Sequence, residues 1–219
     1  MVQPLAVGVL ASGEGTTMEG IVRGIAEYGI PARIVLVVSD REGAHVIDRA
    51  RRAGLQVTVL PVRRTEREAW ASELTRLLRV YGVELVVLAG FLAILPEGWV
   101  EEWRGRAINL HPSLLPRYGG RGMHGLRVHA AVLAAGDRET GAAVHIVTNE
   151  VDGGPVLGQD RIDVRPTDTP ESLRDRLRPI EIRLMTETIR RFAVGELALP
   201  YPVAPSAGAA ASASESRTG

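Results

Sequence analysis

The sequence contains no cysteine and no lysine. All 26 basic side chains are therefore arginines, and they balance 26 acidic side chains to a formal net charge of zero. The lack of cysteine excludes disulfide scaffolds, thiolate nucleophiles, iron–sulfur clusters and cysteine-ligated zinc. The lack of lysine excludes Schiff-base enzymes, lysine-bound pyridoxal enzymes and Walker-type phosphate loops. Because the charges cancel, we expect neither a nucleic-acid partner nor binding to an anionic membrane.

Aromatic residues and long apolar runs are also scarce. Aromatic side chains make up 4% of the 219 residues and hydrophobic ones 45%, so the core must be mainly aliphatic. The apolar run at residues 5–11 is too short to cross a bilayer. Because no basic residue precedes it, we expect no secretory signal. We therefore expect a cytoplasmic protein. The five histidines have no metal-binding spacing, so we expect no metal site.

Short runs of valine, isoleucine and leucine alternate with longer segments of helical apolar spacing. This alternation is typical of βαβ units, and strands that are apolar at successive positions indicate helices on both faces of the sheet. The fold class predicted is α/β, with a doubly wound, mostly parallel, Rossmann-like sheet. The expected strands are 5–11, 34–38, 57–60, 85–88, 107–110, 141–148 and 156–164, and the expected helices are 16–28, 43–53, 67–81, 124–134 and 170–194.

The chain shows no internal repeat and no linker before its last residues. Residues 206–219 are rich in serine, alanine and glycine and lack large apolar side chains. Such a composition cannot build a core, so we expect a disordered tail there. The predicted organisation is one domain over residues 1–205 followed by this tail.

A glycine-rich turn joins the first strand to the first helix. Such a turn can present backbone N–H groups and a helix N-terminus to a phosphate. A dinucleotide fingerprint would need a glycine at position 18, which is Met18, so a monophosphate fits better. The alternative is a tight turn in which a threonine caps the helix. The residues concerned are Gly13, Glu14, Gly15, Thr16 and Thr17.

Asn109 and His111 follow a buried strand and are two positions apart. Side chains two apart in a strand point to the same face, so both can aim at one point at the edge of the sheet. An amide beside an imidazole can stabilise an oxyanion. Pro112 and Pro116 restrict the turn that holds His111. The alternative is a structural histidine at a strand end, whose ring nitrogens form hydrogen bonds with the backbone.

Asp152 lies in a second turn rich in glycine, between the two late strands. Its neighbours Gly153 and Gly154 permit a close approach to a ligand or to an imidazole, whose charged form an aspartate would favour. A simple hairpin turn explains the same residues equally well. Nothing in the spacing brings Asp152 to His111.

The remaining polar features are interpreted as structural. We expect His129 and His145 to lie in the core or to support the site. The arginine-rich stretches 49–52 and 174–178 are typical of solvated helix faces with acidic neighbours.

Four segments in this order resemble the folate-dependent formyltransferase superfamily. They are the glycine turn at 12–15, the segment 89–95 (AGFLAIL), the segment 109–116 (NLHPSLLP) and the segment 151–154 (VDGG). The resemblance covers residues 5 to 200 and is greatest to the members that formylate glycinamide ribonucleotide. It implies the formyltransferase fold, with 10-formyltetrahydrofolate as co-substrate, no metal, and a monomer or homodimer.

The resemblance also implies roles for individual residues. Asn109, His111 and Asp152 would be catalytic, and His145 would support them without contacting the substrates. The folate would contact Arg67, Leu92, Ala93, Ile94, Leu95, Thr148, Asn149, Glu150 and Val151. The phosphate and ribose of the acceptor would contact Gly13, Glu14, Gly15, Thr16, Thr17, Arg178 and Glu181.

Two positions depart from the pattern of the superfamily. Thr17 stands where relatives usually have an asparagine, and Ala93 where they often have a basic residue. The first removes a side-chain contact to the phosphate, and the second weakens attraction for a polyglutamylated folate. Two rival functions are a formyltetrahydrofolate hydrolase and a non-enzymatic nucleotide-binding module.

Overall fold

The computed structural model describes residues 3–63 and 65–199. The predicted tail at 206–219 lies outside this range, and the one-domain organisation stays a prediction. The strands are β1 (Leu5–Ala11), β2 (Ala32–Ser39), β3 (Val57–Val59), β4 (Leu85–Leu88), β5 (Ala107–His111), β6 (Glu139–Ile146) and β7 (Val156–Asp163). The helices are α1 (Thr16–Glu27), α2 (His45–Arg52), α3 (Arg67–Val80), α4 (Glu97–Glu102), α5 (Leu126–Ala134) and α6 (Pro170–Ala193).

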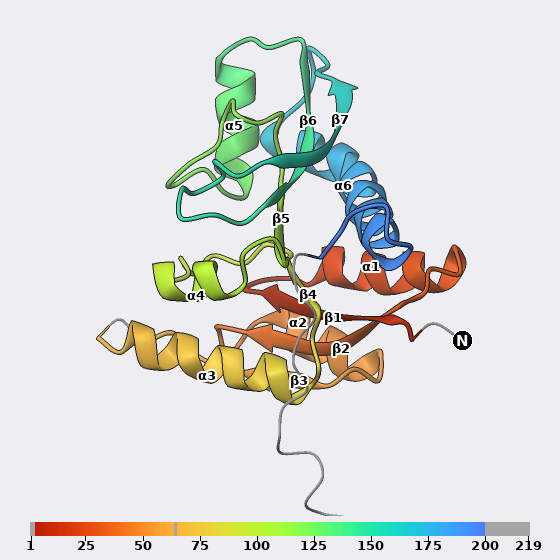
Figure 1. Cartoon of the computed structure of the whole chain (residues 1–219). Coiled ribbons are helices and arrows are strands. Elements are labelled where there is room, and N and C mark those ends of the chain that lie inside the picture. Colours follow the sequence, from red (N-terminus) through yellow and green to blue (C-terminus); the bar gives the residue numbers. More distant parts are fainter. Residues whose placement is uncertain (1–2, 64, 200–219) are drawn as a thin grey trace, which may run out of the picture.

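The described strands form a seven-stranded sheet in the order β3-β2-β1-β4-β5-β6-β7 (Figure 1). The first five pair in parallel, whereas β6 runs antiparallel to β5 and β7 antiparallel to β6. The strand order reverses at β1, which is next to β4. Ligands of open α/β sheets bind at such a switch point, beyond the carboxyl ends of the strands.

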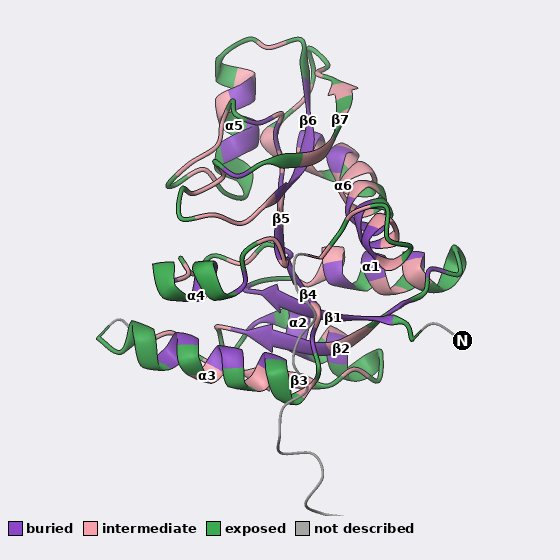
Figure 2. Ribbon diagram, viewed as in Figure 1, coloured by how far each residue is buried: buried purple, intermediate pink, exposed green. Residues whose placement is uncertain are grey.

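Helices cover both faces of the sheet and bury two apolar clusters (Figure 2). One cluster joins the strands to α1, α2 and α6 through residues such as Met18, Ile47 and Met185. The other packs α3 and α4 through Trp70 and Trp103. Every residue of β1 is buried, as expected for a strand covered on both sides. The predicted α/β fold class is confirmed.

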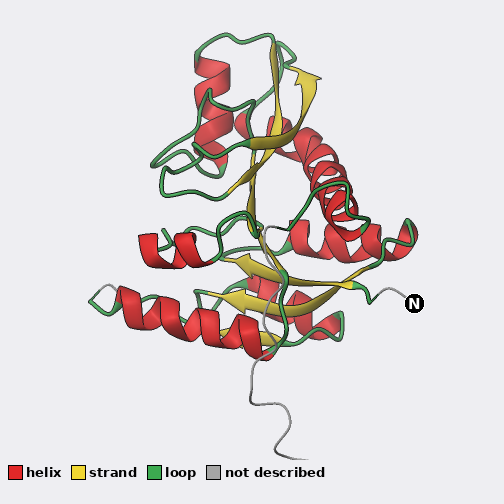
Figure 3. Cartoon of the chain, in the orientation of Figure 1, coloured by secondary structure: helices red, strands yellow, loops and turns green. Residues whose placement is uncertain are grey.

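The boundaries of the predicted elements differ from the observed ones by one or two residues in most cases. Figure 3 shows the helices and strands in the orientation of Figure 1. One helix was not predicted. It is α4, whose six residues follow Pro96 and bury Trp99 and Val100. A segment this short has too few turns to produce a readable helical period.

Helix α6 connects the two ends of the molecule. It contacts α1 at one end, α5 at the other, and β6 and β7 between them (Figure 1). Thr169 begins the helix with a capping box, in which its side chain accepts from the Ser172 amide and the Ser172 hydroxyl accepts from the Thr169 amide. Along the described chain, no helix combines the length and apolar character needed to cross a membrane.

Candidate active site

A cavity of 510 Å³ opens at the carboxyl ends of β4 and β5. This volume is in the range of pockets that bind small molecules. Its walls come from the segments that follow β4 and β5, from the loop between β6 and β7, and from α1, α5 and α6. Among the described residues, no group of three or more histidine, aspartate or glutamate side chains is arranged to hold a metal ion.

The pairing of β5 with β6 places Asn109 opposite His145. The Asn109 amide donates to Nε2 of His145 at 3.0 Å and to Oδ1 of Asp152 at 3.3 Å. Nδ1 of His145 lies 2.9 Å from the carbonyl of Ile146, so this nitrogen carries the proton and Nε2 accepts. His145 thus orients the Asn109 amide.

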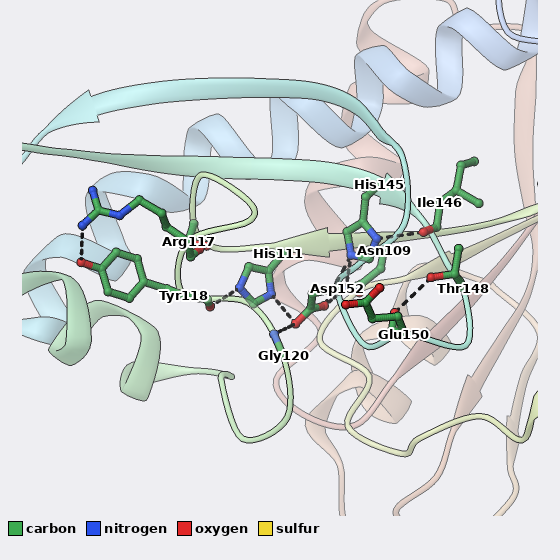
Figure 4. Close-up of polar contacts among 11 residues, drawn as sticks. Asn109, His111, Arg117, Tyr118, Gly120, His145, Ile146, Thr148, Glu150 and Asp152 are labelled. Carbon is green, nitrogen blue, oxygen red and sulfur yellow. Dashed lines mark hydrogen bonds and ion pairs between the residues drawn. The ribbon is translucent and has the colours of Figure 1, made fainter.

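Asp152 is the residue that joins the cluster (Figure 4). Its Oδ2 lies 3.4 Å from Nδ1 of His111 and accepts from the Gly120 amide at 2.9 Å, while its Oδ1 faces Asn109. The predicted convergence of Asn109 and His111 on one point is therefore confirmed, and the carboxylate that sequence spacing left unconnected is at that point. Asp152 has a φ of 58°, in the left-handed region that aspartate tolerates better than most residues.

The pKa of Asp152 is lowered from its usual value. Burial of the carboxylate raises the pKa, but the neighbouring His145, the charge of His111 and the Gly120 amide together outweigh that effect. Asp152 is therefore ionised at neutral pH.

His111 is buried, and its Nε2 lies 2.8 Å from the carbonyl of Tyr118. With Asp152 at the other nitrogen, the ring has an acceptor on each side, an arrangement that favours the charged form. Burial has the larger effect, however, and the pKa of His111 is lowered from its usual value. Asp152 raises the pKa of His111, as expected, but by less than burial lowers it.

Most of the residues assigned to the folate line the cavity. The exception is Arg67, which does not line the cavity; its exposed guanidinium donates to the carbonyl of Ile94, a lining residue. The predicted folate residues that line the cavity are Leu92, Ala93, Ile94, Leu95, Thr148, Asn149, Glu150 and Val151.

The glycine turn contributes less to the cavity than predicted. Thr16 and Thr17 line it, whereas Gly13, Glu14 and Gly15 do not. The carbonyl of Gly13 accepts from the Val46 amide. The side chain of Glu14 lies 3.0 Å from Nδ1 of His45 at the surface. Gly15, with a φ of 74°, is the residue before the helix, and no side chain caps the helix, so the alternative of a threonine cap is wrong.

Arg178 and Glu181 line the opposite wall, on α6. Burial raises the pKa of Glu181 to about 7, although the charge of Arg178 lowers it in part. This carboxyl is therefore divided between its two protonation states near neutral pH. A group of this kind can both accept and donate hydrogen bonds to a ligand.

Sequence reasoning missed three contributions to the cavity. Arg174, which was interpreted as part of a solvated helix face, lines the wall, as does the buried His129 of α5. The loop 120–125 lines it as well. The contribution of Arg174 could have been found from its helical spacing of i, i+4 and i+7 to Arg178 and Glu181.

His129 provides a prediction about stability. Burial, followed by the charge of Arg174, lowers the pKa of His129 to about 4. The unfolded chain then binds more protons than the folded one below pH 6.5, so stability falls as the pH drops from there toward 4. We expect the unfolding free energy of the wild type to fall by about 2 kcal/mol more than that of His129→Gln between pH 7 and pH 5. Urea denaturation at both pH values measures this, and equal losses would contradict it.

Comparison with known proteins agrees with this geometry. The sequence signature of the formyl transferase family matches residues 5–189. The chain therefore belongs to the formyl transferase family, whose members are enzymes.

Within this family the chain is similar to phosphoribosylglycinamide formyltransferases. It is 36% identical over 190 residues to that enzyme of Escherichia coli, covering 86% of this chain and 87% of the relative. The chloroplastic enzyme of Arabidopsis thaliana is 36% identical over 185 residues, covering 84% of this chain and 63% of the relative. The crystal structure of glycinamide ribonucleotide transformylase 1 from Symbiobacterium toebii superimposes with a TM-score of 0.82 at 36% identity, covering 92% and 93% of the two chains.

Some relatives are longer than this chain. The chain spans 63% of the length of the Arabidopsis enzyme and between 13% and 19% of the trifunctional purine biosynthetic proteins of animals that it matches.

Proposed function

We propose that the protein transfers the formyl group of 10-formyltetrahydrofolate to the amine of N1-(5-phosphoribosyl)glycinamide, a step of purine biosynthesis. The observation that carries this proposal is the contact of Asp152 with both Asn109 and His111 inside the cavity. The names of relatives that this chain covers over most of their length support the choice of acceptor.

In the proposed reaction, the acceptor nitrogen attacks the formyl carbon. The carbonyl π bond breaks and leaves a tetrahedral carbon with a negatively charged oxygen, which Asn109 and His111 stabilise. Asp152, through a bound water, moves a proton from the attacking nitrogen to N10 of the folate. The bond between the carbon and N10 then breaks, giving the formylated amine and tetrahydrofolate.

The hydrogen-bond donors of the site are engaged with protein groups before the substrates bind. The Asn109 amide donates to His145 and Asp152, and Nε2 of His111 donates to the Tyr118 carbonyl (Figure 4). The formyl oxygen must therefore replace one of these acceptors. Such rearrangement is common, since catalytic hydrogen bonds often become productive only in the complex.

The two substrates would occupy opposite ends of the cavity. The folate ring would lie between Leu92–Leu95 and the loop 148–151, all of which line the cavity. The phosphate of the acceptor fits the N-terminus of α1 at Thr16 and Thr17, where a helix end favours an anion, with Arg178 opposite. Glu181 would hold the ribose or the amine.

The test is an assay of formyl transfer with both substrates present. We expect loss of the formyl group from the folate only when the acceptor is added. Formate release without acceptor would instead favour a hydrolase. A formyltetrahydrofolate deformylase from Pseudomonas syringae has a related structure, with a TM-score of 0.77 at 25% identity over 86% of this chain and 61% of that one.

Glu181 makes the proposed acceptor site sensitive to pH. Its pKa of about 7 means that the carboxylate form rises from roughly a tenth to nine-tenths of molecules between pH 6 and pH 8. If the carboxylate accepts from the acceptor, the KM of the wild type for the acceptor should fall about fivefold over this range, relative to Glu181→Gln. Parallel pH profiles of KM for the two proteins would refute this role.

A further inference from the structure

The face of α6 that borders the cavity carries three charged side chains in a row. Arg174, Arg178 and Glu181 follow the spacing i, i+4 and i+7, which places them on one side of a helix, and all three line the cavity. Arg178 and Glu181 have roles in the proposed function, whereas Arg174 has none. It lies one turn closer to α5 than Arg178 does.

Arg174 and Arg178 contact the same oxygen atom. Nη2 of Arg174 lies 2.8 Å, and Nη2 of Arg178 3.3 Å, from Oδ1 of Asp175. Two guanidinium groups that share one carboxylate oxygen are close enough to share the oxygens of one phosphate, which carries nearly twice the charge. Asp175 is 54% exposed, and its one carboxylate is shared by the two guanidinium groups.

A buried imidazole beside Arg174 lacks a partner. Nδ1 of His129 is buried and has no hydrogen-bond partner among the described residues, and the side chain lines the same cavity. Buried polar atoms of folded proteins are nearly always satisfied, so a nitrogen of this kind points to a bound group. The charge of Arg174 is near enough to contribute to the lowered pKa of His129, second to burial, so the two side chains are neighbours.

We propose that Arg174 and His129 complete the phosphate site of the acceptor, together with Arg178 and the N-terminus of α1. The Arg174 guanidinium would donate to a phosphate oxygen with charge assistance, and neutral His129 would donate through Nδ1. The ligand class is a phosphate monoester. This inference depends on the proposed acceptor being phosphorylated.

The experiment compares two acceptors, N1-(5-phosphoribosyl)glycinamide and the same compound without its phosphate. Arg174→Gln should raise KM for the phosphorylated acceptor about fivefold, a modest factor because the side chain is 38% exposed. It should leave kcat and the KM for the dephosphorylated acceptor unchanged. Arg183→Gln is the matched control, since Arg183 is on the same helix, pairs with Asp160 and does not line the cavity.

The outcomes separate this inference from the proposed function. Equal KM values of Arg174→Gln and Arg183→Gln for the phosphorylated acceptor would overturn it, as would an equal rise for both acceptors. The turnover of the wild type with the phosphorylated acceptor is measured first. If this turnover does not depend on the acceptor, the proposed function fails. His129→Leu should give the same selective rise in KM, provided that circular dichroism shows it folded. Because Arg174 is partly exposed, its variant decides the question even if His129→Leu does not fold.

Discussion

Asp152→Asn should lower kcat by about 10²- to 10⁴-fold while changing KM for the acceptor by little. The substitution keeps the size of the side chain, and asparagine tolerates the φ of 58° found at this position. It removes the negative charge that faces His111 and the proposed base that accepts a proton through water. The expected loss is therefore one of chemistry and not of folding or binding.

Steady-state kinetics with both substrates measure this effect, and a thermal melt checks the fold. Asp48→Asn makes the same change of charge at an exposed site on α2, where Asp48 pairs with Arg51, and should keep full activity. A kcat of Asp152→Asn within a few-fold of the wild type would show that Asp152 has no part in the proton transfer.

Asn109→Ala should lower kcat by about 10²- to 10³-fold, the usual effect of removing one donor to an oxyanion. The amide donates to both His145 and Asp152, so its loss also leaves Nε2 of His145 without a donor. If the amide acts in the transition state, kcat and kcat/KM should fall together.

A matched substitution separates the two effects of Asn109→Ala. His145→Gln removes the imidazole that orients the amide but leaves the amide in place, so its kcat should fall less than that of Asn109→Ala. A rise in KM for the folate with unchanged kcat in Asn109→Ala would assign the amide to binding of the donor instead.

The part of the site built on one strand was predictable from the sequence. Asn109 and His111 lie two apart after an apolar run, and the period of a strand alone brings them to one face. The α/β class was also predictable, since the strands and helices alternate with clear apolar patterns. These inferences need only local geometry.

Asp152 shows where local geometry is insufficient. It reaches His111 because β6 returns antiparallel to β5 and the loop after β6 then folds over the end of β5. Sequence spacing contains no information on this pairing, and only the resemblance to a family linked the two residues. Arg174 and His129 were missed for a related reason, because the packing of α5 against α6 decides which side of each helix borders the cavity.

Under the roles proposed for Arg174 and Glu181, the position of α6 would also set how long an acceptor the cavity can hold. The helix rises by about 1.5 Å per residue, so Arg174 and Glu181 are separated by roughly 10 Å along its axis. Because α6 is packed against α1 and α5 at its two ends, this separation is set by the helix and not by a flexible loop. An acceptor whose phosphate and amine are much closer together or much farther apart could not reach both Arg174 and Glu181. Such an acceptor would then be excluded by its length alone, whatever its functional groups.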